Sequence, residues 1–216
     1  MKYTHVVWDF NGTVLDDVET GIRAVNRLLA ERDLPTLADA DAYRRVFRFP
    51  IKSYYEALGF DFAKEPYEIV APKWVALYLQ FVTSAPLRPY VKESLGMFAE
   101  RGLLQTLLSA TEQRMLCEQV HGLGLEGYFD RMMGLDHIHA HSKLSLARAW
   151  REENPMAYAF MIGDTVHDFE AAQAMDMDCY LIAGGHQPRE TLMATGAPVY
   201  EDLQALMKHL IAEEKI

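Results

Sequence analysis

The fold of this 216-residue chain is decided by the stretch Asp9-Phe10-Asn11-Gly12-Thr13-Val14-Leu15-Asp16-Asp17. It follows a short apolar run, 4–8, that is typical of a buried β-strand. After it the hydrophobic period becomes helical, with apolar side chains at Val18, Ile22, Val25 and Leu29. An Asn-Gly hairpin is the alternative interpretation of this turn, but a helix rather than a second strand follows it. We therefore expect Asp9 at the carboxyl end of a strand, where open parallel sheets bind ligands.

The rest of the chain shows two kinds of pattern. Residues 17–85 are predicted to be helical, and prolines at 86 and 89 mark the end of this block. Beyond residue 90, helices alternate with short apolar strands, predicted at 103–108, 131–135, 157–162 and 179–183. Such alternation predicts a parallel sheet covered by helices. We expect an α/β fold with a Rossmann-like core, 1–16 and 86–216, and a helical domain, 17–85, inserted after the first strand.

Composition excludes several classes of protein. There is no apolar run of 18 residues, so no transmembrane helix is expected, and the N-terminus does not resemble a signal peptide. The formal net charge is −10 and no strong basic cluster occurs, which disfavours binding to nucleic acid. Cys117 and Cys179 have no metal-ligand spacing and suit a reducing compartment. We expect a cytoplasmic protein, either a monomer or a weak homodimer.

Polar residues follow or precede other predicted elements in positions that suit phosphate chemistry. A carboxylate such as Asp9 can attack phosphorus, Gly12 permits a tight turn beside the phosphate, and Thr13 can donate a hydrogen bond to it. Ser109 and Ala110 follow the strand 103–108, although a serine there is often only a helix cap. Lys143 precedes a predicted helix, 144–152, and could neutralise a phosphoryl group.

A pair of carboxylates indicates a metal. Asp164 and Asp168 lie four residues apart at the start of a predicted helix, after the strand 157–162. Mg²⁺ is typically held by one or two carboxylates together with water and a substrate phosphate. Simple helix capping would also explain such a pair.

These four clusters, in this order, closely resemble the haloacid dehalogenase-like hydrolase superfamily. The resemblance covers nearly the whole chain, including the segments 125–130 and 177–186, and the helical insert is similar to the cap of phosphoglycolate phosphatase-like members. It implies that Asp9 is the nucleophile and that Mg²⁺ is bound by Asp9, the backbone carbonyl of Asn11 and Asp164. It also implies that Ser109 and Lys143 bind the phosphoryl group of a small phosphorylated metabolite, while Asp168 orients the metal site and the lysine.

The chain departs from this family at Asn11. Related phosphatases usually carry an aspartate there, which protonates the leaving oxygen and later deprotonates water. An amide cannot do this, and the loss of general acid–base catalysis typically costs on the order of 10²–10⁴ in rate. His167 or His186 could supply the proton instead, although an isolated histidine is more often a surface residue. Substrates with good leaving groups, or deamidation of the Asn11-Gly12 pair, are the other ways to retain activity.

Substrate choice is expected to come from the insert. Arg48 is the candidate there, because 44–52 is its most cationic segment, although ordinary solvated charge is the simpler explanation. The leading alternative to a phosphatase is a phosphate-binding or regulatory protein whose turnover is impaired by Asn11. A dehalogenase is disfavoured by the acidic pair, since halide displacement needs no Mg²⁺. A phosphoryl transferase would need an acceptor other than water.

Overall fold

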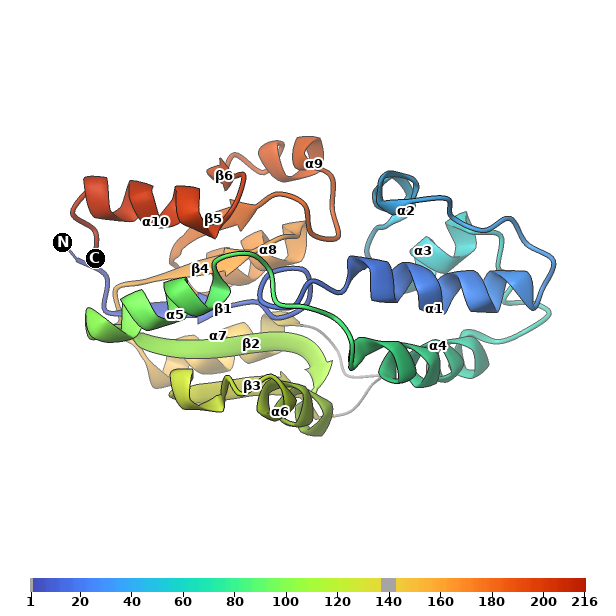
Figure 1. Ribbon diagram of the computed structural model, residues 1–216, viewed down its shortest axis with the longest axis horizontal. Coiled ribbons are helices and arrows are strands. Elements are labelled where there is room, and N and C mark those ends of the chain that lie inside the picture. Colours follow the sequence, from blue (N-terminus) through green and yellow to red (C-terminus); the bar gives the residue numbers. More distant parts are fainter. Residues whose placement is uncertain (1, 137–142) are drawn as a thin grey trace.

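One parallel sheet organises the protein. The computed structural model describes residues 2–136 and 143–216 and places six strands in the order β3-β2-β1-β4-β5-β6 (Figure 1). The strands are β1 (His5–Trp8), β2 (Leu104–Glu112), β3 (Arg131–Leu135), β4 (Ala159–Gly163), β5 (Asp178–Ile182) and β6 (Val199–Tyr200). All the strand pairs are parallel. The predicted α/β fold class is therefore confirmed.

Helices cover both faces of this sheet. The apolar core of one face contains side chains from α5 (Val91–Glu100), α6 (Gln113–Gly122) and α10 (Leu203–Ala212). The core of the other face contains side chains from α7 (Lys143–Glu153), α8 (Val166–Ala174) and α9 (Arg189–Met193). A short 3₁₀ turn, η1 (Glu126–Tyr128), precedes β3. Because β1 lies inside the sheet between two helical layers, its Val6, Val7 and Trp8 are completely buried.

A second, purely helical lobe lies beyond one end of the sheet (Figure 1). It consists of α1 (Val18–Ala30), α2 (Ala40–Val46), α3 (Ile51–Ala57) and α4 (Tyr67–Val82). The four residues whose spacing predicted α1 are all buried in it and belong to a separate apolar core within the lobe. Among the described residues, none of the helices combines the length and the hydropathy that a membrane span needs.

The two connections between the lobe and the sheet lie beside each other. The backbone N–H of Asp16 donates to the carbonyl of Pro86 (2.9 Å), and that of Arg88 donates to the carbonyl of Val14 (3.0 Å). The chain thus leaves the sheet after β1 and returns next to the same point. This arrangement holds the lobe over the carboxyl end of β1, where Asp9 is located.

The second strand is longer than the sequence predicts. We expected a strand at 103–108 followed by Ser109, for which helix capping was the simpler interpretation, but β2 continues through Thr111 to Glu112. Glu112 caps α6 instead, since its carboxylate accepts from the N–H groups of Arg114 (3.1 Å) and Met115 (3.0 Å). Polar residues at 109 and 111 gave no strand signal because they face a site rather than a core.

Candidate active site

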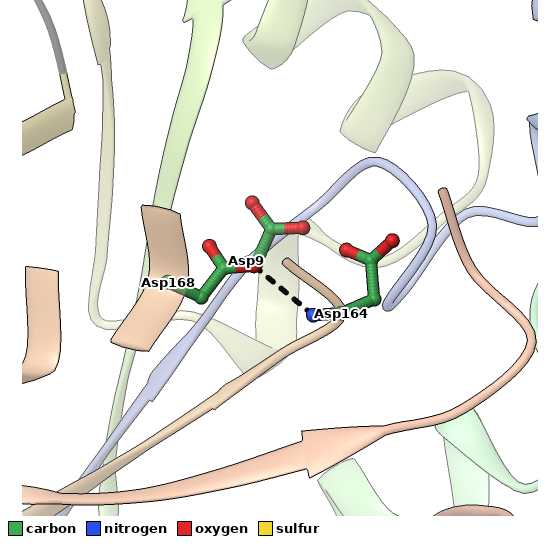
Figure 2. Close-up of side chains that lie close together, drawn as sticks. All are labelled: Asp9, Asp164 and Asp168. Atoms are coloured by element: carbon green, nitrogen blue, oxygen red, sulfur yellow. Dashed lines mark hydrogen bonds between the residues drawn. The ribbon is translucent and has the colours of Figure 1, made fainter. Parts of the chain in front are cut away.

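Three aspartates meet at the carboxyl edge of the sheet. Asp9 follows β1, Asp164 follows β4, and Asp168 lies in the first turn of α8. Since β1 and β4 are neighbouring parallel strands, their ends bring these side chains together, with one oxygen from each within 4.8 Å of the others. Figure 2 shows the three carboxylates side by side, with Asp9 between the other two in this view. All three residues are buried.

Lys143 completes this cluster. Its ammonium group contacts Asp9 Oδ1 and lies 2.5 Å from Asp168 Oδ1, and the lysine is 4% exposed. Burial would lower the pKa of Lys143, but the carboxylates of Asp168 and Asp9 outweigh it and raise the pKa above its usual value. Burial and the Asp168 charge raise the pKa of Asp9, whereas Lys143 opposes that rise. The lysine therefore stays cationic and offsets charge where Asp9 would react.

Asp168 is fixed on both of its oxygens. Oδ1 pairs with Lys143, while Oδ2 accepts from the N–H and hydroxyl of Thr165 (2.9 and 2.7 Å). Oδ2 also accepts from the backbone N–H of Asp164 (3.0 Å), the bond drawn as a dashed line in Figure 2. A carboxylate held this firmly is suited to orient Lys143 and the loop after β4. The orienting role that the family resemblance implies for Asp168 stays a prediction.

The chemistry of the donor set fits a divalent cation. Oxygen atoms of Asp9, Asp164 and Asp168 are close enough to share one ion, and Lys143 contacts two of these three buried carboxylates. Asp164 accepts from the Thr13 hydroxyl (3.2 Å) and the backbone N–H of His186 (2.6 Å). Burial raises the pKa of Asp164 to about 6, with Asp168 adding to the effect and His186 opposing it.

Close packing around Asp168 leads to a stability prediction. A Cβ at Gly163 would lie 2.2 Å from the Cβ of Asp168, whose carboxylate cannot move without breaking several hydrogen bonds. We expect Gly163→Ala to lower the free energy of unfolding by about 1–3 kcal/mol, as overpacking does. Gly96→Ala, in α5 with no atom within 4 Å of the new Cβ, should instead raise it by about 0.5–1 kcal/mol. Urea denaturation of both variants tests this, and equal stabilities would contradict it.

Asn11 is held by hydrogen bonds on both sides of its amide. Its Oδ1 accepts from the Thr111 hydroxyl (2.8 Å), with the Ser109 hydroxyl 3.5 Å away. Its Nδ2 donates to Asp17 Oδ2 (2.9 Å) and to the Tyr78 hydroxyl (2.8 Å). The amide is thus matched to its surroundings, and one of its partners is a second buried carboxylate.

The sequence analysis assigned no role to that carboxylate. Asp17 is 2% exposed and accepts from the Gly12 N–H (2.8 Å) and the Tyr78 hydroxyl (2.7 Å), and its Oδ1 lies 3.2 Å from His186 Nε2. Burial would raise the pKa of Asp17, but the His186 charge and these hydrogen bonds hold it below its usual range. Asp17 directly precedes the predicted helix that begins at Val18, and its position in the sequence gave no sign of these contacts.

His186 is not a surface residue, contrary to expectation. It is 9% exposed, and its Nδ1 lies 2.8 Å from the hydroxyl of Tyr43 in the helical lobe. Burial would lower the pKa of His186, but Asp17 outweighs this and raises it to about 9. His167, by contrast, is partly exposed and stacks on Phe49, with ring centroids 3.6 Å apart.

A cavity of about 280 Å³ lies between the lobe and the sheet edge. Its walls contain most of the residues predicted from the sequence, namely Asp9, Asn11, Ser109, Ala110, Lys143, Asp164 and Asp168. Gly12, Thr13 and Arg48 are not among its described lining residues. The Thr13 hydroxyl is directed to Asp164, and a Cβ at Gly12 would lie 2.3 Å from Asp164 Oδ2. Gly12 thus allows the close approach of two loops.

Two aromatic residues of α4 also line the cavity. Trp74 and Tyr78 are among the lining residues, although the sequence analysis assigned them to no site. They do pack, with stacked rings 4.9 Å apart, but the Tyr78 hydroxyl reaches Asn11 and Asp17. The spacing of aromatic residues along a helix does not show which of them lie at the edge of a lobe. The sequence analysis therefore missed these two lining residues.

Solved structures share this fold. A predicted phosphatase from Clostridium acetobutylicum is 19% identical, with a TM-score of 0.79 over 98% of this chain and 100% of that one. A predicted phosphoglycolate phosphatase from Haemophilus somnus is 13% identical, with a TM-score of 0.78 over 96% and 98%. A haloacid dehalogenase-like family protein from Streptococcus pneumoniae is 18% identical, with a TM-score of 0.78 over 96% and 98%.

The sequence itself carries the assignment to a family. No curated protein matches it significantly. Residues 6–182, however, match the family described as haloacid dehalogenase-like hydrolase, and this span runs from β1 through β5. The family resemblance noted in the sequence is thereby confirmed, and the chain belongs to the haloacid dehalogenase-like hydrolases.

Proposed function

We propose that the protein is a Mg²⁺-dependent phosphatase that uses the Asp9 carboxylate as its nucleophile. One observation carries this proposal: Asp9 is buried at the end of β1, contacts Lys143, and lines the cavity together with Asp164 and Ser109. A carboxylate in such a position can form a bond to phosphorus while a cation offsets the charge on the phosphoryl oxygens.

The reaction has two steps. An oxygen of Asp9 forms a bond to phosphorus as the bond from phosphorus to the leaving oxygen breaks, which gives an aspartyl-phosphate. Water then attacks this phosphorus and releases inorganic phosphate and Asp9. Lys143 would orient the phosphoryl group, with the Ser109 hydroxyl on the neighbouring strand, and Asp168 would hold the lysine in place. Mg²⁺ would be held by Asp9, Asp164 and the backbone carbonyl of Asn11, with Asp168 beside them. It would supply further positive charge.

A second candidate function follows from Asn11. Its side chain is an amide whose nitrogen donates to Asp17 and Tyr78. This position therefore offers no carboxylic acid to protonate a leaving group. A phosphate-binding or regulatory protein with impaired turnover would keep the remaining site intact. Under the phosphatase proposal, the same feature favours acyl and aryl phosphates, whose leaving groups need little acid.

Removal of metal distinguishes enzymatic turnover from background hydrolysis. We expect the protein to release phosphate from acetyl phosphate and para-nitrophenyl phosphate with Mg²⁺, and EDTA to reduce this to background because the carboxylate cluster loses its counter-charge. Excess Mg²⁺ added after EDTA should restore the rate and serves as the control. Turnover that resists EDTA would contradict the proposal, whereas Mg²⁺-dependent phosphate binding without release would favour the second candidate.

The remaining expectations belong to the same proposal. A cavity of about 280 Å³ is at the lower end of typical ligand pockets, roughly 300–1,000 Å³, and supports a small phosphorylated metabolite as the substrate. We propose a cytoplasmic location, which two cysteines without disulfide partners support, and a monomer or weak homodimer.

A further inference from the structure

The helical lobe gives its side of the cavity a different chemistry from that of the sheet edge, where Asp9 lies. Seven aromatic residues of the lobe line the cavity: Tyr43, Phe47, Phe49, Tyr54, Tyr55, Trp74 and Tyr78. Aliphatic side chains of the lobe, including Ile51 and Val75, line it as well. Aromatic walls around a small pocket favour a flat, apolar ligand, because rings stack and exclude water.

The lobe supplies no lysine or arginine to this wall among its described residues. Arg44 donates to the carbonyls of Gly184 and Gly185 (both 2.8 Å), so its guanidinium links the lobe to the sheet. Arg48 is exposed and donates to the carbonyl of Val46 (2.9 Å), and Lys52 lies 5.4 Å from the centre of the Phe62 ring. The cationic segment that the sequence suggested for substrate recognition is therefore directed elsewhere.

The charge of the cavity is strongly negative instead. Five carboxylates line it, Asp9, Asp17, Glu112, Asp164 and Asp168, while Lys143 is the single lysine or arginine among the described lining residues. Lys143 already pairs with Asp9 and Asp168, and the other cationic lining residue, His186, already pairs with Asp17. A metal ion and a phosphoryl group would balance the inner carboxylates, but a second anionic group on the substrate would meet aromatic rings and Glu112. Such a group would lose its hydration without gaining a partner.

Two polar groups beside the cavity, one from the lobe and one from α6, are buried without partners among the described residues. They are the hydroxyl of Tyr54, a residue only 4% exposed, and the side-chain amide of Gln119, on both its nitrogen and its oxygen. Both residues line the cavity. Buried polar groups are nearly always hydrogen-bonded in folded proteins, so an exception beside a cavity points to a ligand that provides the missing partners.

From these observations we propose that the substrate is a phosphate compound whose organic part is an uncharged, planar, aromatic group with polar atoms at its edge. The aromatic rings of the lobe hold its faces, and Tyr54 and Gln119 bind its edge. The proposal rests on the proposed phosphatase function and narrows its substrate class. It excludes compact substrates that carry a second anionic group besides the phosphate, such as a phosphate ester that also carries a carboxylate.

The first test compares substrates with similar leaving groups. With Mg²⁺ present, benzoyl phosphate should be hydrolysed with a kcat/KM about tenfold or more above that of acetyl phosphate, because burial of the ring adds apolar contact. Binding is measured separately by calorimetry, where benzylphosphonate should bind about tenfold or more tightly than ethylphosphonate, and phosphonoacetate no more tightly than ethylphosphonate. Turnover without an aromatic preference would overturn the substrate class and leave the phosphatase intact. An aromatic preference in binding without any turnover would overturn the phosphatase proposal and leave the proposed ligand class intact.

The second test addresses the unpartnered groups. Tyr54→Phe should leave thermal stability unchanged or raise it, because the hydroxyl has no hydrogen-bond partner in the part of the chain that the structure describes. Among 2-, 3- and 4-pyridylmethylphosphonate, at least one isomer should bind the native protein more tightly than benzylphosphonate does, and Tyr54→Phe or Gln119→Leu should remove that gain. Tyr67→Phe is the matched control, since Tyr67 lies in the same lobe outside the described cavity lining. The proposed role of Tyr54 and Gln119 would be overturned if no pyridyl isomer bound the native protein more tightly than benzylphosphonate. It would also be overturned if Tyr67→Phe removed the tighter binding as well.

Discussion

The Asp9→Asn variant is expected to lose phosphate release from acetyl phosphate by at least about 10³-fold, because an amide cannot attack phosphorus. The size and shape of the side chain are nearly unchanged. Replacement also removes one of three carboxylates that lie close together in a buried cluster, so the variant should remain folded. Steady-state phosphate release and a thermal melt of the same sample measure the two effects.

A covalent readout makes this prediction sharper. After acid quenching during turnover of acetyl phosphate, intact-protein mass spectrometry should show one added phosphoryl group on the native chain and none on Asp9→Asn. Asp16→Asn is the matched control, since it makes the same change in the same loop at a residue outside the described cavity lining. If Asp9→Asn retained the native rate, or if the phosphoryl group mapped to another residue, Asp9 would not be the nucleophile.

The fold could be predicted because each part of it has a local signal. The buried run before Asp9 and the helical spacing of Val18, Ile22, Val25 and Leu29 fix where the sheet begins and where the lobe starts. Asp9 and Asp164 could be predicted to meet because the parallel strands that precede them end at one edge of a sheet. These inferences need only the spacing of apolar residues along the sequence and the sheet topology that this spacing implies.

Contacts between the lobe and the sheet could not be predicted in this way. Tyr43 meets His186 across 143 positions of sequence, and Tyr78 meets Asp17 across 61. No periodic pattern encodes how a helical lobe sits on the sheet, and polar contacts with a large separation in sequence follow from that placement alone. For the same reason the cationic segment around Arg48 looked like a substrate-binding surface, although the aromatic residues beside it line the cavity.

The contact between Asn11 and Asp17 limits what a single substitution at Asn11 can achieve. In Asn11→Asp the new carboxylate would replace a donor that lies 2.9 Å from Asp17 Oδ2, so two carboxylates would face each other in a buried site. One of the two must then bind a proton, which raises its pKa and lowers stability near neutral pH. We expect Asn11→Asp to gain little activity and to melt at a lower temperature than the native protein.

Exchanging the two residues avoids this conflict. In Asn11→Asp combined with Asp17→Asn, the amide at position 17 can donate to the new carboxylate and accept from the Gly12 N–H, and the Thr111 hydroxyl still has an acceptor. The double variant places a carboxyl group where a leaving oxygen could be protonated, with the formal charge unchanged. We expect the hydrolysis of ethyl phosphate, which has a poor leaving group, to rise by about 10²–10⁴-fold, and that of acetyl phosphate to change far less.

The rate of ethyl phosphate hydrolysis relative to that of acetyl phosphate distinguishes the possible explanations. A rise confined to ethyl phosphate in the double variant, with no rise in Asp17→Asn alone, would show that the native protein lacks only a general acid. An equal rise on both substrates would mean that the exchange alters binding or folding rather than proton transfer. If the native protein already hydrolysed ethyl phosphate rapidly and the exchange added nothing, another residue must donate the proton. His186, buried against Asp17 and lining the same cavity, would be the first to replace.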